Sequence, residues 1–242
     1  MRSIFGAAAA ASATAAAVVA YQYKEYTEAI AASAHAETHL PLSDEAQKTN
    51  VVRVPSFLTA AEVDDLHALA EELKPLVQLS FPTAPYSEQP PGTDKFLWMA
   101  KSGALSESTW ADSLTYLKQY IAKHGPFDGV LGYSMGACAT ACLLASVPED
   151  TFRFAIVCGG YVPSTSPNIM RALEAKRPFR TASLHCQGRL DKIMTGTGLS
   201  DVLMSYFDER SRELLRHPGG HDVPRDAQHL NSVAAFLMRF AE

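Results

Sequence analysis

Basic residues are scarce in this sequence, and they do not gather into a stripe anywhere along it. Lys and Arg together number 21 against 26 Asp and Glu, so the formal net charge is −5 at pH 7. Proteins that bind nucleic acids usually carry a cluster of basic side chains that neutralises phosphates. The composition therefore argues against nucleic acid as the main partner.

Cysteine is also rare, and its positions exclude two kinds of site. The four cysteines, each in an apolar stretch, are Cys138, Cys142, Cys158 and Cys186. The sequence contains no C-x-x-C pair and no H-x-D motif, so neither a structural zinc site nor an iron-dependent oxygenase site is indicated. Cysteines inside core segments are typical of reduced thiols in a cytosol-like compartment rather than of an extracellular disulfide framework.

Charge is absent from residues 3–23, which are mostly alanine. This segment is close to the ~20 residues needed to span a bilayer, but it lacks the Leu, Ile and Phe core of a strong membrane helix. It is interpreted as a targeting peptide, a membrane anchor or an Ala-rich tail, and membrane contact is not the favoured interpretation. Residues 1–50 are accordingly assigned to an N-terminal tail and linker, and residues 51–242 to one domain.

The domain itself alternates strand-like and helix-like segments. The whole chain is 47% hydrophobic and 19% charged, which is a globular composition. Strands with continuous apolar runs are typical of a parallel sheet that helices cover on both faces, so an α/β fold is expected. The expected strands are 51–54, 76–81, 127–133, 152–158, 181–187 and 213–216, and the expected helices are 59–73, 108–123, 135–145 and 226–240.

A G-x-S-x-G motif, Gly132-Tyr-Ser-Met-Gly136, stands between a predicted strand and a predicted helix. This is the context of a nucleophile elbow, in which two glycines allow a tight turn that lifts the serine hydroxyl above the sheet edge. Ser134 is therefore the candidate nucleophile. The backbone N–H of Met135 would face the oxyanion, and Tyr133 and Met135 are expected to shape the substrate pocket.

A serine hydroxyl is a weak nucleophile unless a base takes its proton, and the sequence offers two histidines for this role. His217-Pro-Gly-Gly-His221 directly follows the last predicted strand. The two glycines would let the loop bring His221 back over the sheet edge. His221 is therefore the preferred base and His217 the competitor, whereas His229 lies inside the last predicted helix.

The acid of such a site should follow an earlier strand. Asp191 comes soon after the predicted strand 181–187 and precedes the histidine loop. The order Ser134, Asp191, His221 is the order expected of an α/β-hydrolase. The alternative acids, none of which follows a strand end, are Asp201, Asp208 and Asp222.

These motifs resemble the FSH-type serine hydrolases, the branch of the α/β-hydrolase superfamily that includes the ovarian cancer-associated hydrolase. The resemblance covers residues 73–242 and implies a three-layer sandwich, a cytoplasmic location, and hydrolysis of a small-molecule ester through Ser134, Asp191 and His221 without a cofactor or metal. An organelle-targeted or membrane-anchored protein is the alternative location. The matching segments are Phe81–Pro85, His124–Gly129, Leu131–Gly136, Ser183–Asp191 and His217–Pro224.

The sequence departs from that family at its start. No His-Gly loop, which would supply the second oxyanion donor, precedes Leu73, so the first strand and the oxyanion loop are atypical or missing. Residues 51–74 are expected to replace the missing strand and helix, with residues 55–57 at the place of the oxyanion loop. If they do not, a truncated or fused pseudo-hydrolase that only binds a partner is the alternative. Residues 162–178, with several Pro and Ser, are expected to form a short cap or loop over the cleft.

Overall fold

The computed structural model describes residues 49–54, 73, 76–87, 96–99 and 105–240. The predictions made for the Ala-rich tail, for residues 59–72 of the helix expected at 59–73 and for the oxyanion loop at 55–57 lie outside these residues. Among the residues described, no helix is both long enough and apolar enough to cross a bilayer.

Within the described residues, six strands form one sheet in the order β2-β1-β5-β6-β7-β8, and every neighbouring pair is parallel. The strands predicted from apolar runs are all present, with ends shifted by one or two residues. Parallel strands buried on both faces need such runs, because neither face meets water. The bounds are β1 (Thr49–Val54), β2 (Val77–Ser80), β5 (Gly129–Tyr133), β6 (Phe154–Cys158), β7 (Ala182–Gly188) and β8 (Arg212–His217).

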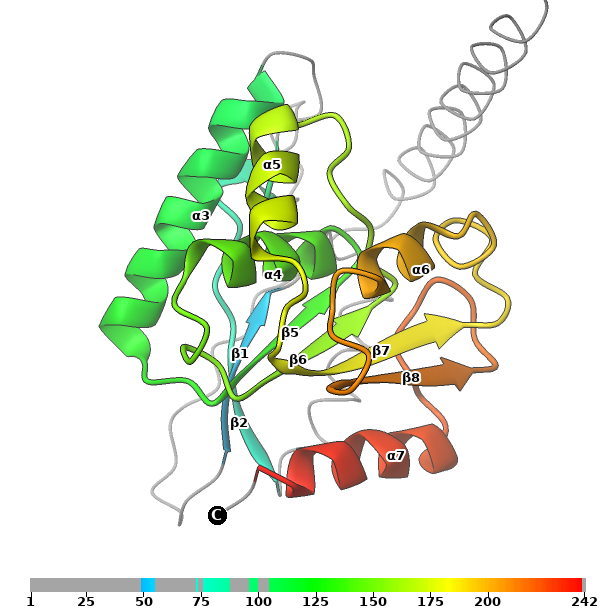
Figure 1. Cartoon of the computed structure of the whole chain (residues 1–242). Helices are drawn as coiled ribbons and strands as arrows, with labels where there is room; N and C mark the ends of the chain where they lie inside the picture. The colour runs from blue at the N-terminus through cyan, green and yellow to red at the C-terminus, as the bar shows by residue number, and fades with distance from the viewer. Residues whose placement is uncertain (1–48, 55–72, 74–75, 88–95, 100–104, 241–242) are drawn as a thin grey trace, which may run out of the picture.

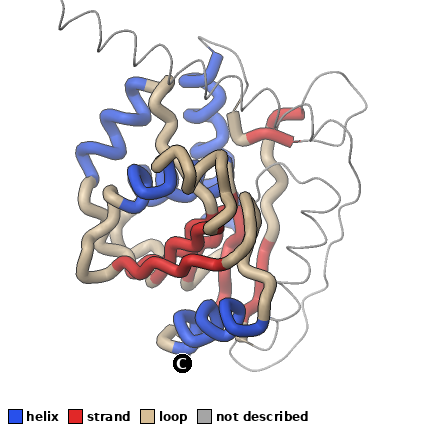
Figure 2. Tube along the Cα trace, turned by 90° about the vertical axis from the view of Figure 1, so that its right-hand side faces the viewer, coloured by secondary structure: helices blue, strands red, loops and turns tan. Residues whose placement is uncertain are grey.

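Helices cover both faces of the sheet, which makes the three-layer sandwich that the sequence predicted. Of the helices labelled in Figure 1, α7 lies on one side of the sheet and α3, α4, α5 and α6 lie on the opposite side, as Figure 2 also shows. Each face has its own hydrophobic core. The helix bounds are α3 (Leu105–His124), α4 (Met135–Ser146), α5 (Pro167–Lys176), α6 (Leu199–Met204) and α7 (Ala227–Met238).

Strand β6 illustrates how the two cores divide the side chains. Ala155 and Val157 belong to the core under α4, whereas Phe154 and Ile156 belong to the core under α7. This alternation follows from the period of two in a strand. All four cysteines of the chain are buried and unpaired, as the sequence analysis expected of reduced thiols.

Strand β1 lies inside the sheet, between β2 and β5. Its residues pair in parallel with β5, with Val52 opposite Val130 and Arg53 opposite Leu131. The prediction that residues 51–54 join the sheet beside the strand leading to Ser134 is therefore confirmed. The strand occupies an interior position, so it closes the gap that an absent first strand would have left in the backbone hydrogen bonding.

The sequence predicted a short cap or loop at residues 162–178, where the structure has a helix. Most of them form α5, which packs against α3 and α4 with Leu173 fully buried. Pro167 stands at the start of this helix, where a missing N–H costs nothing because the first N–H groups of a helix have no partner within it. Pro167 is therefore the first residue of a helix rather than part of a loop. The short pair β3 (Tyr86–Ser87) and β4 (Phe96–Leu97) was also not predicted.

Candidate active site

The parallel sheet brings the predicted site residues together at the carboxyl ends of its strands. Ser134 directly follows β5, Asp191 follows the end of β7 by three residues, and His221 follows the end of β8 by four. Parallel strands all end at the same edge, so loops that leave successive strands meet there. The three residues come from parts of the chain that are far apart in sequence.

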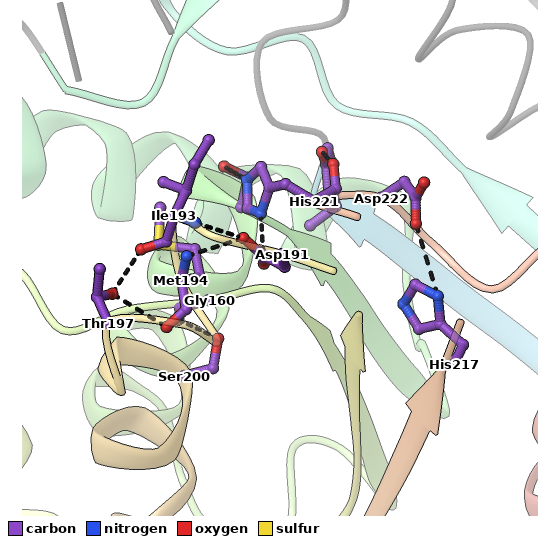
Figure 3. A network of polar contacts seen from close by, with 11 residues as sticks. Gly160, Asp191, Ile193, Met194, Thr197, Ser200, His217, His221 and Asp222 are labelled. Atoms are coloured by element: carbon purple, nitrogen blue, oxygen red, sulfur yellow. Dashed lines mark hydrogen bonds and ion pairs between the residues drawn. The ribbon is translucent and has the colours of Figure 1, made fainter. Parts of the chain in front are cut away.

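A chain of hydrogen bonds joins these three side chains. His221 Nε2 lies 2.9 Å from Ser134 Oγ, and His221 Nδ1 lies 2.9 Å from Asp191 Oδ2. Figure 3 shows the contact between Asp191 and His221 at the centre of a polar network. An ionised carboxylate can only accept, so Nδ1 carries the imidazole proton and Nε2 is left to accept from the serine hydroxyl.

Ser134 sits in a strained turn that the neighbouring glycines permit. Its φ is 53° and ψ −117°, and it is the only non-glycine residue with positive φ in the part of the chain described. A Cβ at Gly132 would come within 2.4 Å of both the Gly136 carbonyl oxygen and Thr140 Oγ1. Strain of this kind is concentrated at functional sites, where the surrounding structure holds it. The Ser134 N–H donates to the Cys158 carbonyl at 2.9 Å, which ties the turn to β6.

Asp191 is held by its own loop as well as by His221. Its Oδ1 accepts the backbone N–H groups of Ile193, at 2.8 Å, and Met194, at 2.9 Å (Figure 3). Burial raises the pKa of Asp191, but the hydrogen bond and charge of His221 and the two N–H groups lower it by more, so the pKa lies below its ordinary value. The carboxylate is thus charged at neutral pH, as an acceptor for the imidazole N–H must be.

The histidine loop passes close to the end of β7. A Cβ on Gly188 would overlap the Gly219 and Gly220 carbonyl oxygens, at 2.6 and 1.9 Å, so only glycine fits at this strand end. The Leu190 N–H donates to the Gly219 carbonyl at 2.9 Å. These contacts fix the loop that carries His221 over the sheet edge.

His217, the competing base, contacts Gly219 and Asp222. It ends β8 with 2% of its surface exposed, and its Nδ1 accepts the Gly219 N–H at 3.2 Å. Asp222 Oδ1 lies 3.6 Å from the same nitrogen (Figure 3). Burial lowers the pKa of His217, and the Asp222 charge offsets only part of this, so His217 is neutral at pH 7. His217 therefore helps to hold the loop that carries His221.

The alternative acids have other partners. Asp201 accepts from Gln187 Nε2 at 3.0 Å, and Asp208 pairs with Arg210 at 3.0 Å. The third alternative, Asp222, contacts His217. Asp191 is the acid that the structure places against His221.

The two predicted pocket residues are both buried. Met135 opens α4 and packs its side chain into the core under that helix, while Tyr133 ends β5 on the opposite face, beside His221. Met135 is 2% exposed and Tyr133 1%. Their expected roles in shaping the substrate pocket remain predictions.

Gly159 is a site residue that the sequence analysis did not find. It directly follows β6, has a φ of +54°, and a Cβ placed on it would lie 3.0 Å from both Cε1 and Nδ1 of His221. Its N–H donates to the Cys186 carbonyl at 3.0 Å. The Gly-Gly pair that ends the apolar run of β6 was the available signal, because a glycine pair at the carboxyl end of a central strand marks a close approach.

We expect Gly159→Ala to lower kcat by about 10- to 100-fold, because the methyl group would push the imidazole away from Ser134 and small displacements of a catalytic group are costly. The matched control is Gly198→Ala. Gly198 also has positive φ, at +76°, but a Cβ there would meet nothing within 4 Å. Ester hydrolysis and thermal unfolding should be measured for both variants. Equal losses of activity in the two variants would mean that backbone strain alone explains the loss. That result would contradict the role given to the contact with His221.

Side chains that could bind a metal do not gather at this site: the described residues contain no group of three or more His, Cys, Asp or Glu suited to a metal ion.

The fold and the chain order of the site are those of the α/β-hydrolases. The Bacillus cereus carboxylesterase superposes with a TM-score of 0.56 at 17% sequence identity, over 79% of this chain and 88% of the other, which is a likeness of fold alone. The model of the FSH1 serine hydrolase family matches residues 63–233. The chain therefore belongs to the FSH1 family of serine hydrolases.

Two relatives illustrate how far this likeness extends. Rhodanese-like domain-containing protein 6 of Arabidopsis thaliana is 29% identical in an alignment 211 positions long that covers 72% of this chain and 36% of that protein. Esterase OVCA2 of Danio rerio is 32% identical in an alignment 151 positions long that covers 58% of this chain and 62% of that protein. The matched region thus spans less than two thirds of the length of either relative.

Proposed function

We propose that this serine hydrolase cleaves small-molecule carboxylic esters, or the related thioesters, through a triad of Ser134, Asp191 and His221. The observation that carries the proposal is the unbroken chain of 2.9 Å contacts from the serine hydroxyl through the imidazole to the carboxylate. The names of relatives such as Esterase OVCA2 support the choice of substrate class.

In the first half of the proposed reaction, Ser134 Oγ attacks the carbonyl carbon of the ester and His221 Nε2 takes the hydroxyl proton. Asp191 accepts the Nδ1–H and stabilises the imidazolium that forms. The tetrahedral intermediate then breaks its bond to the leaving oxygen or sulfur, which receives the proton from His221. The products of this half are the free alcohol or thiol and an acyl-serine.

In the second half, His221 removes a proton from water, which attacks the acyl carbon. The second tetrahedral intermediate expels Ser134 Oγ, and His221 returns the proton to it. The products are a carboxylic acid and the free enzyme. The proton is transferred between the imidazole and reacting oxygens at each step, so this sequence needs neither metal nor cofactor.

The negative charge of each intermediate needs donors. The backbone N–H of Met135 is the proposed first donor, because it directly follows the nucleophile and opens α4, where the helix dipole favours negative charge. The second donor is proposed to come from residues 55–57, which follow β1 in sequence and lie outside the described residues.

A pseudo-hydrolase that only binds a partner is the less supported function. That alternative rests on the missing His-Gly loop, and it would gain weight if the strand next to β5 were missing as well. Strand β1 fills this position, and the three candidate catalytic side chains stand in contact. Both observations favour an enzyme.

The test of the proposal is covalent labelling with a fluorophosphonate probe, which phosphonylates an activated serine and releases fluoride. We expect the probe to label the wild-type protein at Ser134, as located by mass spectrometry, and not to label Ser134→Ala. The matched control is Ser183→Ala. Ser183 is also buried, and its Oγ lies 3.1 Å from Nε2 of His185.

His185 is unsuited to act as a base, since burial and, to a smaller extent, the Arg212 charge lower its pKa to about 3. Labelling should therefore persist in Ser183→Ala. An unlabelled wild-type protein, or labelling that survives Ser134→Ala, would contradict the proposed function.

A further inference from the structure

The side chain of Tyr133 reaches from β5 to the main chain of His221. Its hydroxyl donates to the His221 carbonyl oxygen at 2.5 Å. The two rings also lie close, with centroids 5.2 Å apart and planes at 36°. Tyr133 is only 1% exposed, so this contact is made inside the protein rather than at its surface.

His221 lies in a loop, so contacts with neighbouring segments, rather than regular secondary structure, hold its main chain. Residues 218–225 form neither helix nor strand, and the loop enters His221 through Gly219 and Gly220, which restrict the backbone little. The Asp191 carboxylate orients the ring of His221. It does not fix the main chain from which that ring extends.

Tyr133 and Ser134 are neighbours in sequence, and they contact opposite ends of the same histidine. Ser134 Oγ lies 2.9 Å from Nε2 of the ring, while Tyr133 bonds the carbonyl oxygen of the main chain. The end of β5 thus sets both the position of the nucleophile and the position of its base. A displacement of this strand end would move both groups together.

We infer that Tyr133 is a positioning residue that holds His221 at the distance from Ser134 that proton transfer needs, rather than a residue that lines the substrate pocket. The inference rests on the proposed function, because it assigns His221 the role of base. The hydroxyl group carries the effect, and the ring packs in the core with or without it.

The experiment compares Tyr133→Phe with a matched control, Tyr206→Phe. Tyr206 is also buried, at 4% exposed, and its hydroxyl also makes a 2.5 Å hydrogen bond, to Glu174 on α5. Both variants lose one hydroxyl and keep the ring. Active serines should first be titrated with the fluorophosphonate, so that rates refer to folded, reactive enzyme only.

We expect Tyr133→Phe to lower kcat about tenfold, the loss typical of one buried hydrogen bond. The KM for a small ester should stay the same, because the hydroxyl faces His221. The pH at which kcat/KM is half-maximal should move lower, since a looser contact with Asp191 stabilises the protonated base less. Tyr206→Phe should keep the wild-type kcat and pH profile.

Two results would overturn the inference while leaving the triad intact. One is a Tyr133→Phe variant with wild-type kcat and pH profile, and the other is a raised KM with unchanged kcat, which would indicate a pocket residue. A wild-type protein that shows no hydrolysis dependent on Ser134 would overturn both the inference and the proposed function, so the two failures can be told apart.

Discussion

Replacing His221 with alanine is expected to lower kcat for ester hydrolysis by about 10⁴-fold or more, as is typical when a triad loses its base. The serine hydroxyl would then have no proton acceptor at the 2.9 Å that separates it from Nε2 in the structure. Asp191 would also lose the partner that lowers its pKa. Initial rates on a small chromogenic ester measure the loss directly.

His217→Ala is the matched control for that variant. His217 ends β8 and accepts the Gly219 N–H, so its loss should loosen the loop and cost about tenfold, the scale of one hydrogen bond. The difference between the two histidines is thus expected to be about a thousandfold. A large loss at His217 with little loss at His221 would reverse their roles.

Asp191→Asn is expected to lower kcat by about 10⁴-fold while leaving the fold intact. The reason lies in the two carboxylate oxygens. Oδ1 accepts the N–H groups of Ile193 and Met194, so the amide oxygen of an asparagine would take that place. Its NH₂ group would then face His221 Nδ1 and donate to it. The imidazole proton would have to sit on Nε2, which could no longer accept from Ser134.

Asp201→Asn is the control for this substitution. Asp201 is the alternative acid on α6, and its Oδ1 accepts from Gln187 Nε2 at 3.0 Å. Its replacement should change kcat less than about fivefold, because surface substitutions away from a functional feature have small effects. Comparable losses in the two variants would remove Asp191 from the triad.

Much of the fold could be predicted because the core strands leave a clear pattern. In β5 and β6 every residue is buried, and their uninterrupted apolar runs predicted a parallel sheet covered on both faces. The placement of Ser134, Asp191 and His221 could be expected for the same reason. Each lies within four residues after the end of a recognisable strand, and the carboxyl ends of parallel strands lie on the same side of the sheet.

Other features could not be predicted, because they depend on contacts between distant segments. Nothing in the sequence of residues 49–54 fixes whether that strand lies at the edge or inside the sheet. The donor role of Tyr133 depends on where the loop after β8 passes, and the need for glycine at 159 depends on the orientation of the His221 ring. Helix α5 was not predicted for a local reason, since the several Pro and Ser residues of 162–178 favoured a short cap or loop.

Because β1 lies inside the sheet, the folding unit begins before the segment that matches the family model. The match to the family model begins at residue 63, whereas β1 comprises Thr49–Val54 and pairs with β5 from Gly129 to Gly132. A polypeptide starting at residue 63 would leave the N–H and C=O groups on that edge of the catalytic strand without partners. The hydrolase could therefore be transplanted into another protein only together with this strand, or into a host that supplies a strand of its own.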